Sequence, residues 1–275
     1  ILDIHVVNEN EIWTCQNNGF IFYTLDGGAQ WQEIDPAIIN SNRTNAIYAN
    51  DEGKIWVAGK YVSLVYSADF GAHWTDQIPN AKSTMYMPHF FDENIGLVGS
   101  SEGVVLRTIN GGASWDKLQL GGTENFFAVQ MVNAQAMIIG SSSGKVFGSL
   151  NQGDTWTMIG ENLGQVTDLH AFNLQSAVLT NESGSIYKTE NGGAQWDKVY
   201  EEPADILMGL DFVNAQKGWA CGWYGQILYT ENGGNTWVSQ HYDGRSQLSD
   251  IHFTTENEGW AVSSSFTDTI WHTSN

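Results

Sequence analysis

The stretch TENGGAQW at residues 189–196 decides the fold of this 275-residue chain, because close copies of it recur at a nearly constant interval. Five further copies align with it: TLDGGAQW (24–31), SADFGAHW (67–74), TINGGASW (108–115), SLNQGDTW (149–156) and TENGGNTW (230–237). The final tryptophans of neighbouring copies lie 40 to 43 residues apart. A fixed period of this length is typical of a repeat architecture, in which each unit is one supersecondary element.

Each period contains four short segments with the patterning of β-strands. In the sixth unit they are MGLDFV (208–213), KGWACG (217–222), QILYT (226–230) and WVSQH (237–241). Short alternating segments joined by tight turns are typical of propeller blades. The sequence therefore predicts an all-β fold, a seven-bladed β-propeller with four-stranded blades. We expect a single domain over residues 1–275, with blades at about 1–35, 43–78, 84–120, 125–160, 166–201, 205–241 and 247–275.

The repeated motif has a mechanical explanation as the turn between strands three and four. A Ser or Thr ends the third strand, and an Asp or Asn two residues later can accept hydrogen bonds from amides of the turn. These acceptors are Asp26, Asp69, Asn110, Asn151, Asn191 and Asn232. A glycine two residues further allows the positive φ that the reversal needs. We expect the tryptophans to be buried between adjacent blades, as structural residues: Trp31, Trp74, Trp115, Trp156, Trp196 and Trp237.

All six copies match the hydroxyl, Asp/Asn, Gly and Trp positions of the Asp-box, also called the bacterial neuraminidase repeat. The longer unit GWACGWYGQILYTENGGNTW (218–237) resembles propellers of the photosystem II assembly and stability factor-like family. The likeness covers essentially the whole chain. It implies that the boxes are structural and lie on the face opposite the usual binding surface. It also implies a protein-binding function in a periplasm-like or lumenal compartment.

The seventh unit is incomplete within the sequence. It has strand patterns at about 248–254, 258–263 and 268–273, but no motif tryptophan or fourth strand. The family resemblance implies that residues preceding the first inner strand supply this outer strand. We therefore expect it to come from outside the 275 residues, either from trimmed flanking residues or from another chain. Donation of a strand between subunits would cause self-association.

Alignment of the inner strands places polar residues at one repeat position: His5, Tyr48, His89, Gln130, His170, Asp211 and His252. Asp3, Asp168 and Asp250 stand two residues earlier in three of these strands, on the same strand face. His5, His170, Asp211 and His252 are thus candidates for a metal site near the axis. The alternative is that these side chains form hydrogen bonds in the narrow space between blades, and we expect no metal.

A binding patch is predicted on the face opposite the motif turns, in the loops between strands two and three and between blades. Exposed aromatic residues beside arginines favour recognition of a protein or a sugar. The candidates are Arg43, Tyr61, Trp223, Tyr224, His241, Tyr242, Arg245 and Phe266. The alternative is that these aromatic side chains pack on their own blades.

The sequence argues against an enzyme and against a cofactor. Sialidases share the Asp-box but clamp a carboxylate with three arginines. The three arginines of this chain are Arg43, Arg107 and Arg245; none is followed by Ile-Pro, and Arg107 lies in a third strand beside a motif turn. Ser-His-Asp, phosphate-loop and Cys/His metal motifs are also missing. Cys15 and Cys221 occupy equivalent strands of blades 1 and 6, with blade 7 between them, so we expect free thiols rather than a disulfide.

Composition narrows the partners. The chain has 31 acidic and 11 basic residues and a net charge of −20, which opposes binding to nucleic acid. It has no apolar run of about 18 residues, so no membrane span is expected. It starts at Ile1 without a signal-peptide pattern, and Asn, Ser, Thr and Gly are plentiful. These features favour a processed, exported protein at the cell surface or in the periplasm.

The functional hypothesis is a non-catalytic, exported propeller that acts as a protein-binding or structural scaffold, as a subunit of a cell-surface assembly. One alternative is a photosystem II assembly-type factor. The arginine-rich patch associated with that family is a poor match to three arginines. The other alternative is a glycan-binding lectin or a glycosidase of sialidase-like fold.

Overall fold

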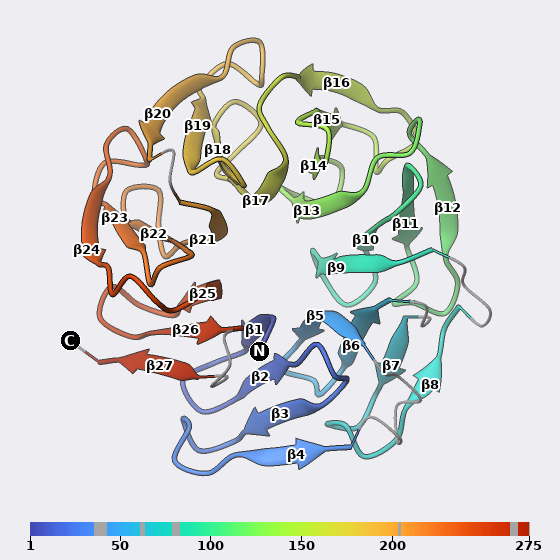
Figure 1. The fold of residues 1–275 in the computed structure, drawn as a ribbon. Helices are drawn as coiled ribbons and strands as arrows, with labels where there is room; N and C mark the ends of the chain where they lie inside the picture. Colours follow the sequence, from blue (N-terminus) through green and yellow to red (C-terminus); the bar gives the residue numbers. More distant parts are fainter. Residues whose placement is uncertain (36–42, 61–63, 79–82, 203–204, 265–268, 275) are drawn as a thin grey trace.

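The computed structural model describes residues 1–35, 43–60, 64–78, 83–202, 205–264 and 269–274. These residues form seven antiparallel sheets arranged in a ring around a central axis, with the first and last sheets side by side (Figure 1). The described part of the chain contains strands and turns, and no helix in it could cross a membrane. The prediction of an all-β, seven-bladed propeller is confirmed.

Each blade is a meander that runs outward from the axis. The innermost strands are β1 (Asp3–Val6), β5 (Thr44–Ala49), β9 (Met85–Phe90), β13 (Phe126–Met131), β17 (Val166–Ala171), β21 (Leu207–Phe212) and β25 (Leu248–Phe253). The second strands are β2 (Ile12–Cys15), β6 (Ile55–Gly59), β10 (Gly96–Ser100), β14 (Met137–Ser141), β18 (Ala177–Asn181), β22 (Gly218–Gly222) and β26 (Gly259–Ser263). Every residue of these second strands is buried, because a neighbouring blade covers each face.

The outer strands complete the blades. The third strands are β3 (Ile21–Thr24), β7 (Val65–Ser67), β11 (Val104–Thr108), β15 (Val146–Ser149), β19 (Ser185–Thr189), β23 (Ile227–Thr230) and β27 (Ile270–Thr273). The fourth strands are β4 (Gln32–Ile34), β8 (Thr75–Asp76), β12 (Asp116–Gln119), β16 (Thr157–Gly160), β20 (Asp197–Glu201) and β24 (Val238–His241). Blade 7 has three strands among the described residues.

In the described part of the chain, buried apolar residues form seven clusters, each between two neighbouring blades. The motif tryptophans belong to these clusters. Trp31 of blade 1, for example, packs with Trp260 and Val262 of blade 7, and this contact joins the two ends of the ring. Trp237 lies near Phe212, with 5.9 Å between ring centroids. Burial of such rings removes much apolar area from water and so holds neighbouring blades together.

The motif turn has the same hydrogen bonds in each of the six copies. In the copy that opens the sequence analysis, the Thr189 hydroxyl donates to Asn191 Oδ1 at 3.1 Å and accepts from the Gly193 amide at 2.9 Å. Asn191 Oδ1 also accepts from the Gln195 amide at 2.9 Å. Gly193 has a φ of +87°, a conformation that favours glycine. The spacings of the hydroxyl, Asp/Asn and Gly positions in the motif are therefore set by its internal hydrogen bonds.

Both cysteines are buried and free, in β2 and β22. Burial raises the pKa of both thiols well above the usual value. The thiols of Cys15 and Cys221 are consequently protonated and contribute to packing.

Candidate functional site

The polar residues of the innermost strands join neighbouring blades. Asp3 Oδ2 accepts the Ile47 amide of blade 2 at 2.7 Å, and Asp168 Oδ2 accepts the Leu210 amide of blade 6 at 2.8 Å. Asp250 Oδ2 accepts a hydrogen bond from the Ile4 amide of blade 1 at 3.1 Å. Gln130 and Asp211 form equivalent bonds from a strand position two residues further along. Gln130 Oε1 accepts the Ala171 amide, and Asp211 Oδ2 accepts the Phe253 amide. This pattern matches the alternative of hydrogen-bonded side chains between blades.

Burial controls the protonation of the polar side chains on the innermost strands. It lowers the pKa of His5 to about 3 and that of His89 to about 4, so both imidazoles are neutral near pH 7. Burial raises the pKa of Asp168 to about 8. It also raises the pKa of Asp250, whose carboxyl group is hydrogen-bonded to that of Asp3. Since two facing carboxylates repel, one proton is retained between them.

The four metal candidates do not converge on one point. Asp211 holds the Phe253 amide at 2.7 Å, and His170 packs against Phe172 and Phe212. The rings of His5 and His252 lie 6.0 Å apart between centroids. Among the residues that the structure describes, no three His, Cys, Asp or Glu side chains are placed to hold a metal ion.

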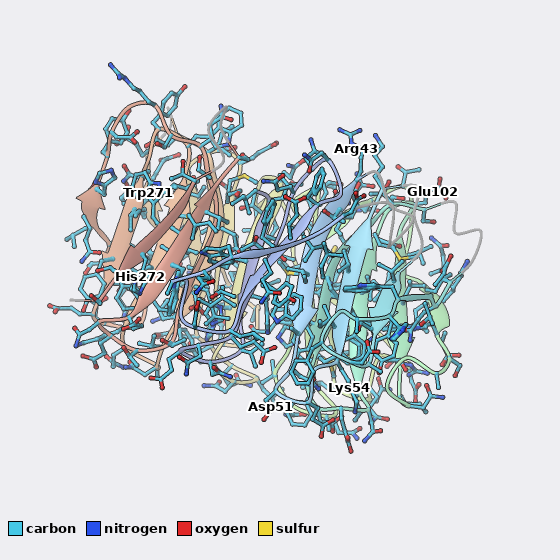
Figure 2. The ribbon with its side chains drawn as sticks, turned by 90° about the horizontal axis from the view of Figure 1, so that it is seen from below. Arg43, Asp51, Lys54, Glu102, Trp271 and His272 are labelled. Atoms are coloured by element: carbon cyan, nitrogen blue, oxygen red, sulfur yellow. The ribbon has the colours of Figure 1, made fainter. Side chains whose placement is uncertain are left out.

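The ring has two distinct faces. Figure 2 shows Arg43, which precedes β5, and Glu102, in the turn between β10 and β11, on one face, and Asp51 and Lys54, in the turn between β5 and β6, on the other. The motif turns lie on the second face, because their amides bond to the turns between strands one and two, as Gly192 N does to Gln175 O at 2.9 Å. We call the face of Arg43 the loop face and that of Asp51 the box face.

Six of the eight predicted patch residues can be placed; Tyr61 and Phe266 lie outside the described residues. The structure brings the blade 6 members together. The loop of residues 242–247 folds back on the turn between β22 and β23, where the Asp243 and Gly244 amides bond to Tyr224 O at 3.1 and 2.8 Å. Tyr224 and Tyr242 are 40% and 56% exposed, with 6.4 Å between ring centroids.

The remaining predicted residues surround this tyrosine pair or lie apart from it. Trp223 forms a bridge to Gln247, and His241 contacts the ring of Trp271 at 5.1 Å between centroids. Arg245 is exposed after the turn. Arg43 bonds to Asn17 Oδ1 at 3.3 Å, on the other side of blades 7 and 1 from blade 6, and so does not join the pair.

Tyr224 has a strained backbone. Its φ is +60° and that of Gly225 is +71°, the combination of a type I′ hairpin turn. The first position of this turn favours Gly, Asn or Asp, and a bulky residue there costs roughly 1–2 kcal/mol. Because Tyr224 remains 40% exposed, burial offsets only part of this cost.

Carboxylates that the sequence analysis did not select lie near the tyrosine pair. Desolvation, followed by the charges of Asp205, Glu202 and Asp243, raises the pKa of Tyr242. Asp243 is fixed by bonds from the Arg245 and Ser246 amides at 2.7 and 2.8 Å. The sequence signal for this loop was the Asp-Gly pair at 243–244, which is typical of a turn. Asp205 precedes β21, and no local sequence pattern indicates that its charge acts on Tyr242.

Comparisons with known proteins agree with the repeat. The family model described as photosynthesis system II assembly factor YCF48 matches residues 77–207, slightly less than half of the chain. A structure of YCF48 from Cyanidioschyzon merolae is 19% identical, with a TM-score of 0.76 over 95% of this chain and 92% of that chain. A structure of YCF48 bound to a D1 peptide is 17% identical, with a TM-score of 0.76 over 95% and 89%.

The fold alone is shared more widely. The WD40 β-propeller domain of Doa1 is 12% identical, with a TM-score of 0.80 over 100% of this chain and 93% of that chain. A search of curated proteins by sequence gave no match. At these identities the solved structures establish the fold, and the family model adds the likeness of the repeat units. The chain is therefore an Asp-box-type seven-bladed propeller that resembles the photosystem II assembly factor YCF48 family.

Proposed function

We propose that residues 1–275 act as one non-catalytic propeller domain of the photosystem II assembly-factor type, which binds a peptide segment of a partner protein on the loop face of blade 6. The match of the family model and the solved complex of YCF48 with a D1 peptide support this function over a cell-surface scaffold. An exported, periplasm-like or lumenal compartment fits the composition of the chain. No arginine-rich patch is needed, because the tyrosine pair supplies the contact surface.

The main evidence for this site is the backbone conformation of Tyr224. A bulky aromatic residue that remains 40% exposed has a backbone conformation that disfavours it. Strain of this kind is held by the surrounding structure and is found most often at functional sites. Tyrosine also offers a large rigid contact area at low entropic cost, together with a hydroxyl for hydrogen bonds. We therefore expect Tyr224 and Tyr242 to contact a bound peptide segment together.

The charges around the pair define the peptide that fits. The charges of Asp205, Glu202 and Asp243 act on Tyr242. Glu202 and Asp243 are exposed and can be reached by a partner, whereas Asp205 is buried. A Lys or Arg of the partner would meet carboxylates and could lie over a tyrosine ring, which is favourable. We infer a segment that brings a basic side chain to the tyrosine pair.

The experiment measures binding of a fluorescently labelled D1 peptide by anisotropy, against a scrambled peptide of equal charge. Tyr224→Asn should weaken binding at least tenfold. The same substitution should raise the free energy of unfolding by about 1 kcal/mol, because Asn adopts positive φ more readily.

Glu102→Asn is the matched control. Glu102 occupies the same turn position in blade 3, with a φ of +62°. Its replacement should relieve similar strain and leave peptide binding unchanged. Undiminished binding by Tyr224→Asn, or equal binding of the scrambled peptide, would refute the proposed site.

A further inference from the structure

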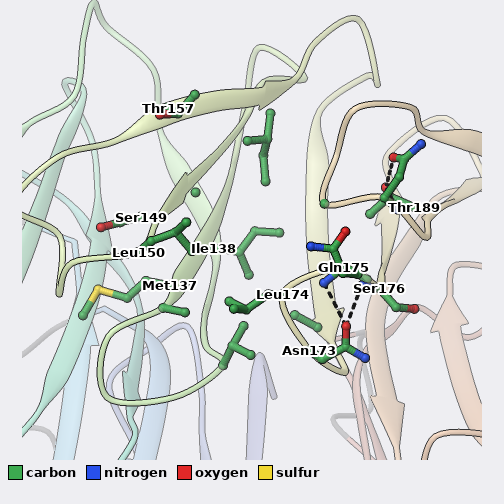
Figure 3. A pocket seen from close by; sticks show the side chains of 18 of the residues that line it. Met137, Ile138, Ser149, Leu150, Thr157, Asn173, Leu174, Gln175, Ser176 and Thr189 are labelled. Carbon is green, nitrogen blue, oxygen red and sulfur yellow. Dashed lines mark hydrogen bonds between the residues drawn. The ribbon is translucent and has the colours of Figure 1, made fainter.

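A cavity of about 510 Å³ opens on the box face between blades 4 and 5 (Figure 3). Its walls come from β14 and β15 of blade 4, from β17 and β18 of blade 5, and from the turns beside them. Figure 3 shows Ile138, Leu150 and Leu174 around the open space. The volume lies in the range of binding sites for small ligands. This cavity is on the opposite face from the tyrosine pair.

The repeat explains why this interface is hollow. At one register position on the second and third strands, blades 1, 2 and 6 carry a Trp paired with a Tyr: Trp13 with Tyr23, Trp56 with Tyr66 and Trp219 with Tyr229. Their ring centroids are 4.5, 4.9 and 5.2 Å apart, and the rings fill the space toward the next blade. The corresponding pair in blade 4 is Ile138 with Gly148.

The facing blade is also small at the matching place. Blade 5 presents Ala171 at the end of its inner strand, where blades 3, 6 and 7 have Phe90, Phe212 and Phe253. Phe90 and Phe253 stack on Trp56 and Trp219 at 4.0 and 3.7 Å between centroids. The cavity between blades 4 and 5 thus occupies the place of an absent aromatic pair.

The walls of the cavity specify a neutral, apolar occupant. None of its lining residues carries a charge, although the chain has a net charge of −20. Ile138 and Ala171 line the cavity with buried apolar surface, and Asn173 and Gln175 contribute amide groups. Burial of a charge here would cost free energy without compensation, whereas an aromatic ring would gain from apolar contact.

The exposed residues at the rim of the cavity favour a polypeptide over a free small molecule as its occupant. Leu150 and Leu174 stand at the mouth with 72% and 48% of their surface exposed. A molecule confined to the cavity would leave Leu150 in water. A chain that inserts one side chain and continues across the rim would cover both leucines, which is the arrangement of an anchor residue in a protein interface.

We propose that the cavity between blades 4 and 5 is a docking site for an uncharged aromatic side chain of a partner polypeptide. The inserted ring takes the place that Trp13 and Tyr23 fill within blade 1. The site is independent of the peptide site on blade 6. A partner that used both faces would be held by two separate contacts, and each can be removed without the other.

The first test titrates the capped peptide Ac-Gly-Trp-Gly-NH₂ into the isotopically labelled protein and follows amide shifts by NMR. Shifts should cluster on residues 136–140, 148–151 and 171–177. Ac-Gly-Lys-Gly-NH₂ should cause none. Absence of localised shifts with the Trp peptide would overturn the proposal. Binding of free indole without binding of the Trp peptide would assign the cavity to small molecules and also overturn it.

The second test refills the cavity with the residue type of the other blades. A Cβ at Gly148 would meet Ile159 Cδ1 at 3.2 Å, the mobile end of a side chain, so Gly148→Tyr can be accommodated. This variant should bind the Trp peptide at least tenfold more weakly and melt at the same or a higher temperature. Ile138→Phe serves as a second filling variant should Gly148→Tyr not fold. Unchanged binding by a folded, filled variant would refute the site.

Matched controls separate the rim and the two faces. Leu150→Ser should weaken binding, whereas Leu25→Ser, the same motif position in blade 1 with 50% exposure, should not. Tyr224→Asn should leave the Trp peptide titration unchanged, and Gly148→Tyr should leave D1 peptide binding unchanged. Loss of both activities in either variant would show that the two sites are not independent.

Discussion

At the scale of single residues, one buried hydroxyl organises each motif turn. Thr230, 1% exposed, accepts the Gly234 amide at 3.0 Å and donates to Asn232 Oδ1 at 3.0 Å. The hydroxyl thereby links the end of β23 to both the side chain and the backbone of the turn. A group buried with these partners contributes modestly when bonded, but its removal leaves the amide unpaired.

Thr230→Val tests this hydroxyl, because valine keeps the shape and removes the acceptor. We expect the free energy of unfolding in urea to fall by about 1–3 kcal/mol. Thr236→Val is the control in the same turn: its hydroxyl accepts from Asn232 Nδ2 at an exposed position, where water can replace it. That change should cost less than about 0.5 kcal/mol. Equal effects would contradict the central role of Thr230.

Residue patterns predicted this turn well, because its side-chain hydrogen bonds join residues two to four positions apart. They predicted Tyr224 and Tyr242 as exposed loop residues for the same local reason. They did not select Asp205 or Glu202, since these residues approach Tyr242 through a connection between blades. Short-range spacing carries information about turns, whereas contacts between loops depend on the assembled ring.

At the scale of elements, the inner strands are joined by carboxyl groups rather than by a continuous sheet. Alternation predicted that the Asp and His residues share a strand face. It could not show that Asp168 reaches the Leu210 amide, because this contact depends on the spacing between blades. The alternatives of metal site and hydrogen-bonded seam were therefore open in the sequence. In the structure the oxygens of Asp168 accept the Leu169 and Leu210 amides.

The buried Asp168 predicts a pH dependence of stability. Its pKa rises from 3.8 to about 8 on folding, so between these values the folded state binds a proton that the unfolded state lacks. Stability must then fall as pH rises through this window, by at most about 1.4 kcal/mol per pH unit for one group. His5 and His89 have lowered pKa values and act in the opposite direction, from about pH 3 to 6.5.

Comparison of Asp168→Asn with the parent chain cancels the contribution of the histidines. Asparagine can accept one of the two amides but cannot ionise. We expect the variant to be less stable than the parent at pH 5 and to become relatively more stable as the pH reaches 8, measured by urea unfolding. A constant difference across this range would mean that Asp168 does not change protonation on folding.

At the scale of the whole molecule, the period of the repeat predicted the number of blades and their order around the ring. The repeat also indicates the cavity between blades 4 and 5, because Ile138 and Gly148 stand where other blades have a Trp and a Tyr. The cavity was missed because binding was expected on the loop face, and because a gap arises from the sum of small residues on two blades. A comparison of side-chain volumes at equivalent register positions would have found it.

Charge is the second property of the whole molecule with a testable consequence. The chain carries a net charge of −20, and its compact state brings these charges together. Such self-repulsion destabilises the folded state and is reduced by salt. Salt also weakens ion pairs, which lowers the stability that they provide. They include Arg107 with Asp154 at 2.6 Å and Lys198 with Glu201 at 2.6 Å. An exposed pair such as that of Lys198 with Glu201 contributes only about 0.2–1 kcal/mol.

Because exposed ion pairs are weak and the excess of negative charge is large, repulsion should dominate the response to salt. We expect the urea midpoint to rise when NaCl is increased from about 10 mM to 150 mM, as the screening length falls from about 30 Å to 8 Å. KCl at equal ionic strength should give the same shift, since screening does not depend on the identity of the monovalent cation. A midpoint that falls with salt would show instead that ion pairs between blades, such as that of Arg107, outweigh the repulsion of the surface.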